Sequence, residues 1–179
     1  MAFCGCLTTI ERSCDNSIGG LDKIWAIPYD SVETTVVDGE VTAFNIGTFS
    51  TGLTVSCDLV QIQVNKDSSS YTEEANIDLV NGTTLYNITL SAMIGRRDLA
   101  KRNAILLMGA GQQNLLLIIK DNNGIYWLMG HETGANLTGV GEGSGQAKAD
   151  NSKYSLTFLA EQREMMPVLD DTVVLSLGI

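Results

Sequence analysis

Residues 115–130 have the sequence Leu-Leu-Leu-Ile-Ile-Lys-Asp-Asn-Asn-Gly-Ile-Tyr-Trp-Leu-Met-Gly, which is two apolar runs joined at Asn123-Gly124. Asn-Gly between strand-like runs predicts a β-hairpin, because both central residues of a type I′ turn need a positive φ. Residues 115–119 are all apolar, which indicates a strand covered on both faces. We therefore expect residues 115–129 to form the central hairpin of a β domain and to act as a scaffold, not as a reactive centre.

The composition favours one β-rich globular domain. The chain has 179 residues, of which 44% are apolar and only 18% charged, with 18 Gly and 2 Pro. This length suffices for a substantial core, and the composition argues against wholesale disorder. We expect residues 1–20 to form an N-terminal arm and residues 21–179 to form a single β domain.

The net charge of −10 limits the partners of the protein, since eleven basic residues face twenty-one acidic ones. A nucleic-acid surface needs excess Lys and Arg, and anionic lipid disfavours an acidic protein. The acidity either keeps the protein soluble or repels a polyanion that passes by. The N-terminal residues lack a signal-peptide pattern, and no apolar run reaches the ~18 residues of a membrane span. We expect no membrane association and folding in a reducing cytosol.

Further strands follow from period-two alternation and turn signals. They are expected at 21–32, at 36–44 about Asp38-Gly39, at 54–66, at 76–80 and 83–93 about Asn81-Gly82, and at 154–161. The chain ends in an apolar run, which includes Val173 and Leu175 and needs cover from the domain or from a neighbour. In the strand at 54–66, Gln61 and Gln63 alternate with apolar residues and therefore share a polar face.

One helix is expected, over residues 99–108. Asp98 can cap its start, and Ala100, Ala104, Leu107 and Met108 have the spacing of an apolar stripe. A helix of about three turns must pack on the sheet to be stable. The fold class predicted is mainly β, a β-sandwich or small barrel with one flanking α-helix.

Residues 130–153 contain six glycines and almost no apolar periodicity, which predicts a long loop. The segment lacks the Lys-Ser/Thr of a phosphate-binding loop and carries Glu142 in its middle. A glycine-rich loop that becomes ordered against a partner is the preferred interpretation. We expect subunit contacts at Gly134, Asn136, Gly139, Gly141, Gly143 and Gly145 of this loop, and at Val173 and Leu175 near the C-terminus.

The sequence gives little support for a metal site, a cofactor or an active site. Cys4, Cys6 and Cys14 could ligate zinc, with Cys57 or His131 as a fourth ligand, but the usual pair of Cys-x₂₋₄-Cys spacings is absent. We expect these cysteines to be free thiols. The two alternatives are a zinc site and disulfides that form after release into an oxidising environment. The chain has one histidine and no nucleophile motif, so we expect no enzyme and no cofactor.

The chain resembles small tail proteins of tailed bacteriophages and prophages of the Bacteroidetes group, including crAss-like phages. The resemblance spans most of the chain and rests on structural motifs: Cys4-Gly5-Cys6, residues 19–28, Asn103-Ala104, residues 120–130, the glycine-rich segment, and Tyr154-Ser155-Leu156-Thr157-Phe158. It implies a non-enzymatic virion protein of the tail or neck with a tail-tube-like fold. Such proteins assemble into rings whose inner wall is a continuous β-barrel, and their loops and arms join neighbouring subunits.

The partners implied are further copies of the chain, six in a tube or twelve in a neck ring, and other tail or neck proteins. Phage DNA would pass through the channel only transiently, during ejection, and assembly would take place in the host cytoplasm. On this basis Gln61 and Gln63 are expected to face the lumen. The alternative is a carbohydrate-binding β-sandwich of a phage fibre or surface protein, which would need exposed aromatic rings at Trp25, Tyr126 or Trp127.

Overall fold

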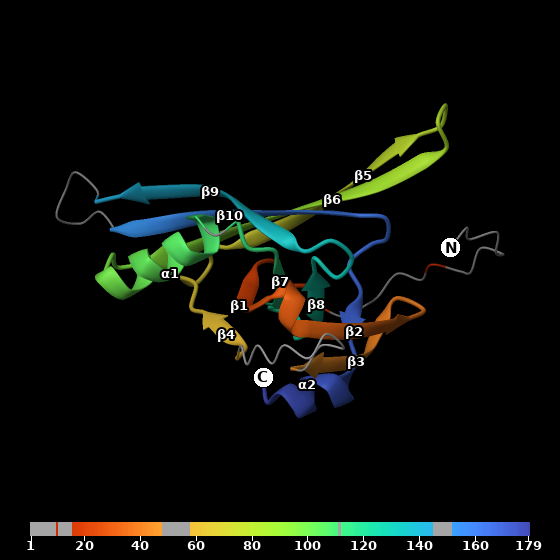
Figure 1. The fold of residues 1–179 in the computed structure, drawn as a ribbon, viewed down its shortest axis with the longest axis horizontal. Helices are drawn as coiled ribbons and strands as arrows, with labels where there is room; N and C mark the ends of the chain where they lie inside the picture. The colour runs from red at the N-terminus through yellow and green to blue at the C-terminus, as the bar shows by residue number, and fades with distance from the viewer. Residues whose placement is uncertain (1–9, 11–15, 48–57, 111, 145–151) are drawn as a thin grey trace.

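The computed structural model describes residues 10, 16–47, 58–110, 112–144 and 152–179 (Figure 1). The described part of the chain is mainly β, with 53% of its residues in strands and 14% in two helices. The strands are β1 (Leu21–Pro28), β2 (Val32–Val37), β3 (Glu40–Ile46), β4 (Val60–Ile62), β5 (Ser70–Asp78), β6 (Thr83–Gly95), β7 (Leu115–Asp121), β8 (Tyr126–Met129), β9 (Ala135–Gly143), β10 (Lys153–Gln162) and β11 (Val168–Leu169). The helices are α1 (Leu99–Ala110) and α2 (Asp171–Leu177), and a 3-10 turn (Tyr29–Ser31) follows β1.

All eleven strands belong to one open mixed sheet with the order β2-β3-β11-β8-β7-β9-β10-β6-β5. β1 pairs with β7 along its whole length and with β4 on its other side. Figure 1 shows the long strands β9, β10, β6 and β5 along one side of the molecule, with β2, β3 and α2 at the opposite side. None of the described helices is long and apolar enough to cross a membrane.

The central position predicted for residues 115–119 is confirmed. β7 lies between β1 and β8, and its first five side chains are all buried. Leu115, Leu117 and Ile119 join the apolar side chains of β6, β10 and α1 in one core cluster. Leu116 and Ile118 point to the other face, where β3 and α2 cover them.

The turn of this hairpin differs from the predicted type I′ geometry. Gly124 has a φ of 88°, but Asn123 is not among the residues with positive φ. The loop has three residues, because Asp121 N donates to Ile125 O at 3.0 Å. Asp121 supports this loop from inside: its Oδ1 accepts the backbone N–H groups of Asn123 and Ile125, both at 2.9 Å. A buried carboxylate therefore fixes the turn, which the Asn-Gly signal did not predict.

The turn also holds the entering chain. The Asn123 side chain accepts from Ile18 N at 2.8 Å and donates to Ile18 O at 3.1 Å, while Asn122 Nδ2 donates to Gly19 O at 2.7 Å. Residues 18–20 are thus fixed to the domain at the point where β1 begins. Most of the predicted arm, 1–9 and 11–15, lies outside the described residues.

The other two predicted hairpins are present, but not all of their strands begin and end where the sequence predicts. Asp38 and Gly39 have φ values of 53° and 84° and form the expected two-residue turn between β2 and β3. The hairpin about Asn81-Gly82 has a four-residue loop, and its first strand begins at Ser70 instead of residue 76. The strand predicted at 54–66 is reduced to β4, since residues 63–65 are not in a strand and 54–57 fall outside the described part.

The helix predicted at 99–108 is confirmed as α1, and Asp98 Oδ1 accepts from Lys101 N at 2.8 Å at its start. The predicted apolar stripe is right only at Met108, which packs against the core. Ile105 is the buried residue, whereas Ala100, Ala104 and Leu107 are exposed. The fold also has a second helix. Asp170 caps α2 by accepting from Thr172 N at 2.7 Å, so the final apolar run is helical and buries Val173 and Val174.

The segment 130–153, predicted to be a long loop, contains the strand β9. β9 pairs with β10 over its length, from Lys153↔Gly143 to Ala160↔Ala135. Gly139 and Gly141 lie directly over Thr157 and Ser155, where a β-carbon would be 3.4–3.5 Å from those side chains. Glycines here allow close packing within a sheet, which hides the alternation that marks a strand in the sequence.

Candidate functional site

The long strands β9, β10, β6 and β5, here called the long-strand section, present one polar face. One side of β6 and β10 is buried in the core, and the opposite side carries small polar residues. This polar face comprises Thr72, Glu74 and Asn76 of β5, Asn87, Thr89 and Ser91 of β6, Ser155, Thr157, Leu159 and Glu161 of β10, and Asn136 of β9. These eleven residues include two glutamates, and the exposed Lys153 continues the same alternation at the start of β10, so the face carries charges of both signs with a small acidic excess.

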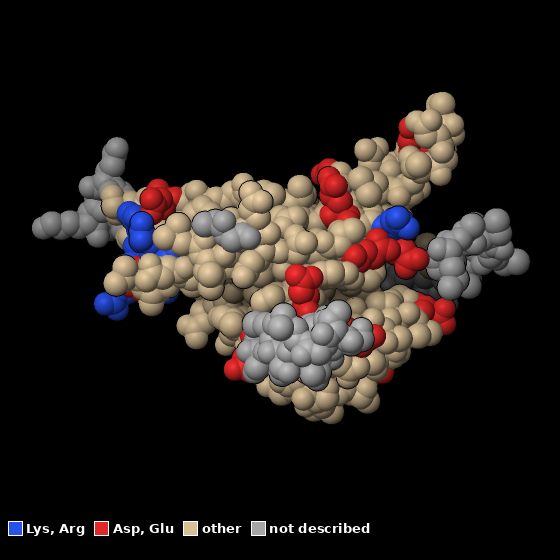
Figure 2. Space-filling model, in the orientation of Figure 1, with Lys and Arg blue, Asp and Glu red and all other residues tan. Residues whose placement is uncertain are grey.

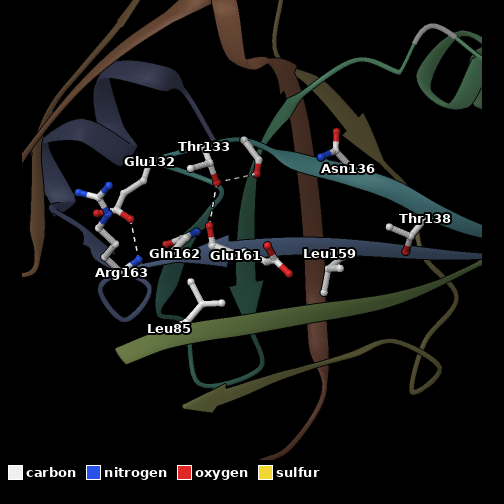
Figure 3. Close-up of a pocket in the computed structure, with 10 residues that line it drawn as sticks. Leu85, Glu132, Thr133, Asn136, Thr138, Leu159, Glu161, Gln162 and Arg163 are labelled. Atoms are coloured by element: carbon white, nitrogen blue, oxygen red, sulfur yellow. Dashed lines mark hydrogen bonds between the residues drawn. The ribbon is translucent and has the colours of Figure 1, made fainter. Parts of the chain in front are cut away.

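A pocket of about 470 Å³ opens where this face meets the turn before β9 (Figure 3). Its walls come from β6, β9, β10 and residues 132–134. The lining residues are Leu85, Glu132, Thr133, Gly134, Asn136, Thr138, Leu159, Glu161, Gln162 and Arg163. Two carboxylates, three amide or hydroxyl side chains of β9 and its turn, and two leucines give the pocket a mixed polar character.

Residues 132 and 133 fasten the turn before β9 to the end of β10. The hydroxyl group of Thr133 donates to Glu161 O at 2.8 Å, and Glu132 Oε2 accepts from Arg163 N at 2.6 Å (Figure 3). Gly130 makes the turn possible, because its φ is 87° and a β-carbon there would lie 2.7 Å from Ala135 N. The pocket wall is therefore held by hydrogen bonds to backbone atoms.

Gln162 is the most unusual residue of the pocket. Its side chain is 1% exposed, and neither its amide nitrogen nor its amide oxygen has a hydrogen-bond partner among the described residues. It follows Tyr154, Leu156, Phe158 and Ala160 on the core side of β10. An unpaired buried amide costs free energy, so it is a group that a hydrogen-bonding ligand or water would satisfy. In the sequence, Gln162 continues the every-second-residue pattern of the buried apolar side chains of β10, and this position could have identified it.

The long-strand section has two unpaired edges within the described residues. β5 is the last strand of the sheet and pairs only with β6. β9 pairs with β10, and its other edge meets β7 only at Ala135↔Leu115. Unpaired backbone N–H and C=O groups along such edges can pair with a strand of another chain.

Arg97 links α1 to the end of β9. Its Nη2 lies 2.6 Å from Glu142 Oε2, and its guanidinium is 5.5 Å from the centre of the Tyr154 ring. The side-chain interaction with Tyr154, followed by the charge of Glu142, raises the pKa of Arg97 further above its usual range. The cation therefore stays charged at any physiological pH and keeps the start of α1 beside the sheet.

The structure divides the predicted contact residues among several places. Gly134 and Asn136 line the pocket, and Gly139, Gly141 and Gly143 continue along β9. Gly145 lies outside the described residues, as do Cys4, Cys6, Cys14 and Cys57. Val173 of α2 is buried against the core, whereas Leu175 of the same helix is 80% exposed. Gln61 and Gln63 are exposed on and after β4, away from the polar face of the long-strand section.

The aromatic residues proposed for sugar stacking form no open platform. Trp25 is buried, and Tyr126 stacks against it with ring centres 6.1 Å apart. Trp127 is half-buried, and its Nε1 donates to Asp121 Oδ2 at 3.4 Å. In the part of the chain that the structure describes, no three His, Cys, Asp or Glu side chains gather in a way that could hold a metal ion.

Comparison with known proteins finds no matching family model and no matching curated protein.

Proposed function

We propose that this chain is a virion structural subunit that assembles with copies of itself into a ring of a bacteriophage tail or neck. The observation that carries the proposal is the pair of unpaired edges, β5 and β9, on opposite sides of the long-strand section. An edge of one copy that pairs with the other edge of the next makes a heterologous contact, and such contacts close into rings when the rotation permits. The fold that goes with the proposal is a tail-tube-like β-sandwich or small barrel.

The polar face gives the ring a wall suited to DNA passage. If the long-strand sections of neighbouring copies join, this face would line the channel instead of Gln61 and Gln63, which belong to the β4 region. Its side chains are mostly hydroxyl and amide groups, and its two glutamates outnumber its one cation, Lys153 at the start of β10. DNA would therefore slide along the wall without being held by it.

The contact residues proposed on β9 fit this arrangement in part. Gly139, Gly141 and Gly143 lie along the unpaired edge, where a glycine lets a neighbouring backbone approach closely. Deleting residues 134–147 is not a sharp test of the contact, because the deletion removes β9 and the buried Ala135. The contact is better tested at single residues and through the backbone.

The test combines mass with amide hydrogen exchange. Light scattering after size-exclusion chromatography, together with negative-stain microscopy, should show rings or tubes at high protein concentration. In the assembled species the outward amides of β5 and of residues 136–143 should exchange more slowly than in the dissociated subunit. The amides of β7, which β1 and β8 already pair, serve as the internal control and should not change. A strict monomer at high concentration would refute the proposal.

A further inference from the structure

The tip of the β5–β6 hairpin is an exposed apolar surface at one end of the molecule (Figure 1). Leu79 and Val80 are 90% and 94% exposed, and Ile77 is 60% exposed. Asp78 holds the loop between the strands by accepting from Val80 N at 2.9 Å and Asn81 N at 3.2 Å. The tip is thus preorganised, and two large side chains are presented to water on a defined turn.

A second exposed apolar surface lies on α1. Leu99 and Leu107 are 72% and 66% exposed, and Leu106 is also exposed. Leu99, Arg102, Asn103 and Leu106 are at positions i, i+3, i+4 and i+7, so they share one face of the helix. Ile105 is the residue that α1 buries against the core. The helix therefore has an outer face of leucines with a cation between them, which no described residue covers.

The two surfaces carry opposite charge. The hairpin from residue 70 to residue 95 contains Glu73, Glu74 and Asp78 and neither Lys nor Arg. Residues 96–102, which lead into α1, contain four of the eleven basic residues: Arg96, Arg97, Lys101 and Arg102. Arg97 pairs with Glu142 and Lys101 with Asp98, so the basic residues of this region still outnumber the acidic ones. Figure 2 shows most of the visible Lys and Arg atoms at the α1 end, with acidic atoms beside them, and acidic atoms at the hairpin tip. Opposite charge at matching apolar patches favours contact between them.

We propose that the hairpin tip of one copy docks on the outer face of α1 of the next copy. Leu79 and Val80 would cover Leu99 and Leu106, with Asp78 near Arg102. The inference rests on the proposed function: the paired strand edges would join copies within one ring, and the tip would join copies of successive rings. The two patches differ and lie toward opposite ends of the longest axis, along which β5 and β6 run (Figure 1), so the contact is head to tail between copies displaced along the strands and fits the stacking of rings.

Other binding partners fit the charges of the hairpin tip and of α1 less well. A tip-to-tip contact would bring two copies of Asp78 together, and a contact between two α1 helices would oppose two copies of Arg102. Like charges at an interface disfavour association. Insertion of the tip into an anionic membrane is opposed by the three acidic residues of the hairpin.

A complementation experiment tests the contact. A tip variant, Leu79→Ser with Val80→Ser, keeps α1 intact, and an α1 variant, Leu99→Ser with Leu106→Ser, keeps the tip intact. Each alone should need at least about tenfold more protein to assemble than the unchanged chain, as expected for removal of an apolar hot spot. Mixed in equal amounts, they should form a one-to-one complex through the remaining tip and α1 surfaces.

Two further variants make the result interpretable, the first as a control and the second as a test of the charge match. Met165→Ser removes a comparably exposed apolar side chain far from both patches in sequence and should assemble as the unchanged chain does. Arg102→Glu retains a good helix former and should weaken assembly by removing the charge match. Circular dichroism and thermal melting should show that all variants are folded, since each altered side chain is exposed.

The outcomes separate the inference from the proposed function. Assembly of both double variants at the same concentration as the unchanged chain would overturn the docking of the tip on α1 and leave the ring proposal standing. Loss of assembly in both variants without recovery in the mixture would also overturn head-to-tail docking. An unchanged chain that stays monomeric would overturn both proposals.

Discussion

Leu116 and Leu117 are neighbours in the chain, yet their side chains lie in two different hydrophobic clusters. Leu117 packs with residues of β6, β10 and α1, and Leu116 packs with residues of β3 and α2. Both are at most 1% exposed. β7 thus joins the two halves of the core, since successive side chains of a strand point to opposite faces.

Leu116→Ala and Leu117→Ala should each lower the free energy of unfolding by about 2–5 kcal/mol, because each leaves a cavity in a different closed core. Denaturant unfolding followed by tryptophan fluorescence measures the change. Leu175→Ala, at an exposed position of α2, should stay within about 0.5 kcal/mol. A small effect of either β7 substitution would show that its cluster contributes little to stability.

Asp121→Ala should destabilise the protein by about 1–3 kcal/mol, because it removes the buried carboxylate that accepts the backbone N–H groups of Asn123 and Ile125. The Asn122 and Asn123 contacts with residues 18–20 should loosen at the same time, which faster amide exchange at Ile18 would report. Glu33→Ala, at an exposed position on β2, is the control. Equal stability of the two variants would contradict the structural role of Asp121.

Gly130→Ala should cost clearly more stability than Gly124→Ala. The two glycines have nearly the same φ, 87° and 88°. A β-carbon at Gly124 meets nothing within 4 Å, so only the left-handed conformation is penalised, by about 1–2 kcal/mol. At Gly130 it would lie 2.7 Å from Ala135 N and 2.9 Å from Leu115 O, which are backbone atoms. Matching melting temperatures for the two variants would refute this difference.

The start of α1 should lose stability in acid. The N–H of Lys101 and then the Lys101 side chain lower the pKa of Asp98 below the ordinary aspartate value of about 3.9. The carboxylate therefore stabilises the folded state above that value, and the contribution is lost as the pH falls through the lower folded-state pKa. Titration of Asp98 by NMR checks the direction, and Asp98→Ala should remove this part of the acid response. A titration at or above the ordinary value would contradict the cap.

Part of the candidate site could be predicted from the sequence. Subunit contact by the glycine-rich segment stays a prediction, but two of its named residues, Gly134 and Asn136, line the pocket. Gln162 was missed because the predicted strand ended at residue 161, and Asp121 was missed because the Asn-Gly pair alone was used to predict the turn. α2 was missed although Asp170 and Gly178 are helix-capping residues, since the β-branched Val173 and Val174 favour a strand by propensity.

Several local features follow from the amino-acid sequence alone: the buried strand β7, the turn at Asp38-Gly39, the start of α1 at Asp98 and the mainly β class. These depend on side-chain periodicity and on backbone conformations that few residue types adopt. Only the tertiary structure decided which strands are neighbours, that β9 lies on β10, and that β5 and β9 end with unpaired edges. The physical reason is that strand pairing joins residues far apart in the chain, so its partners are chosen by the packing of the whole core and not by local preference.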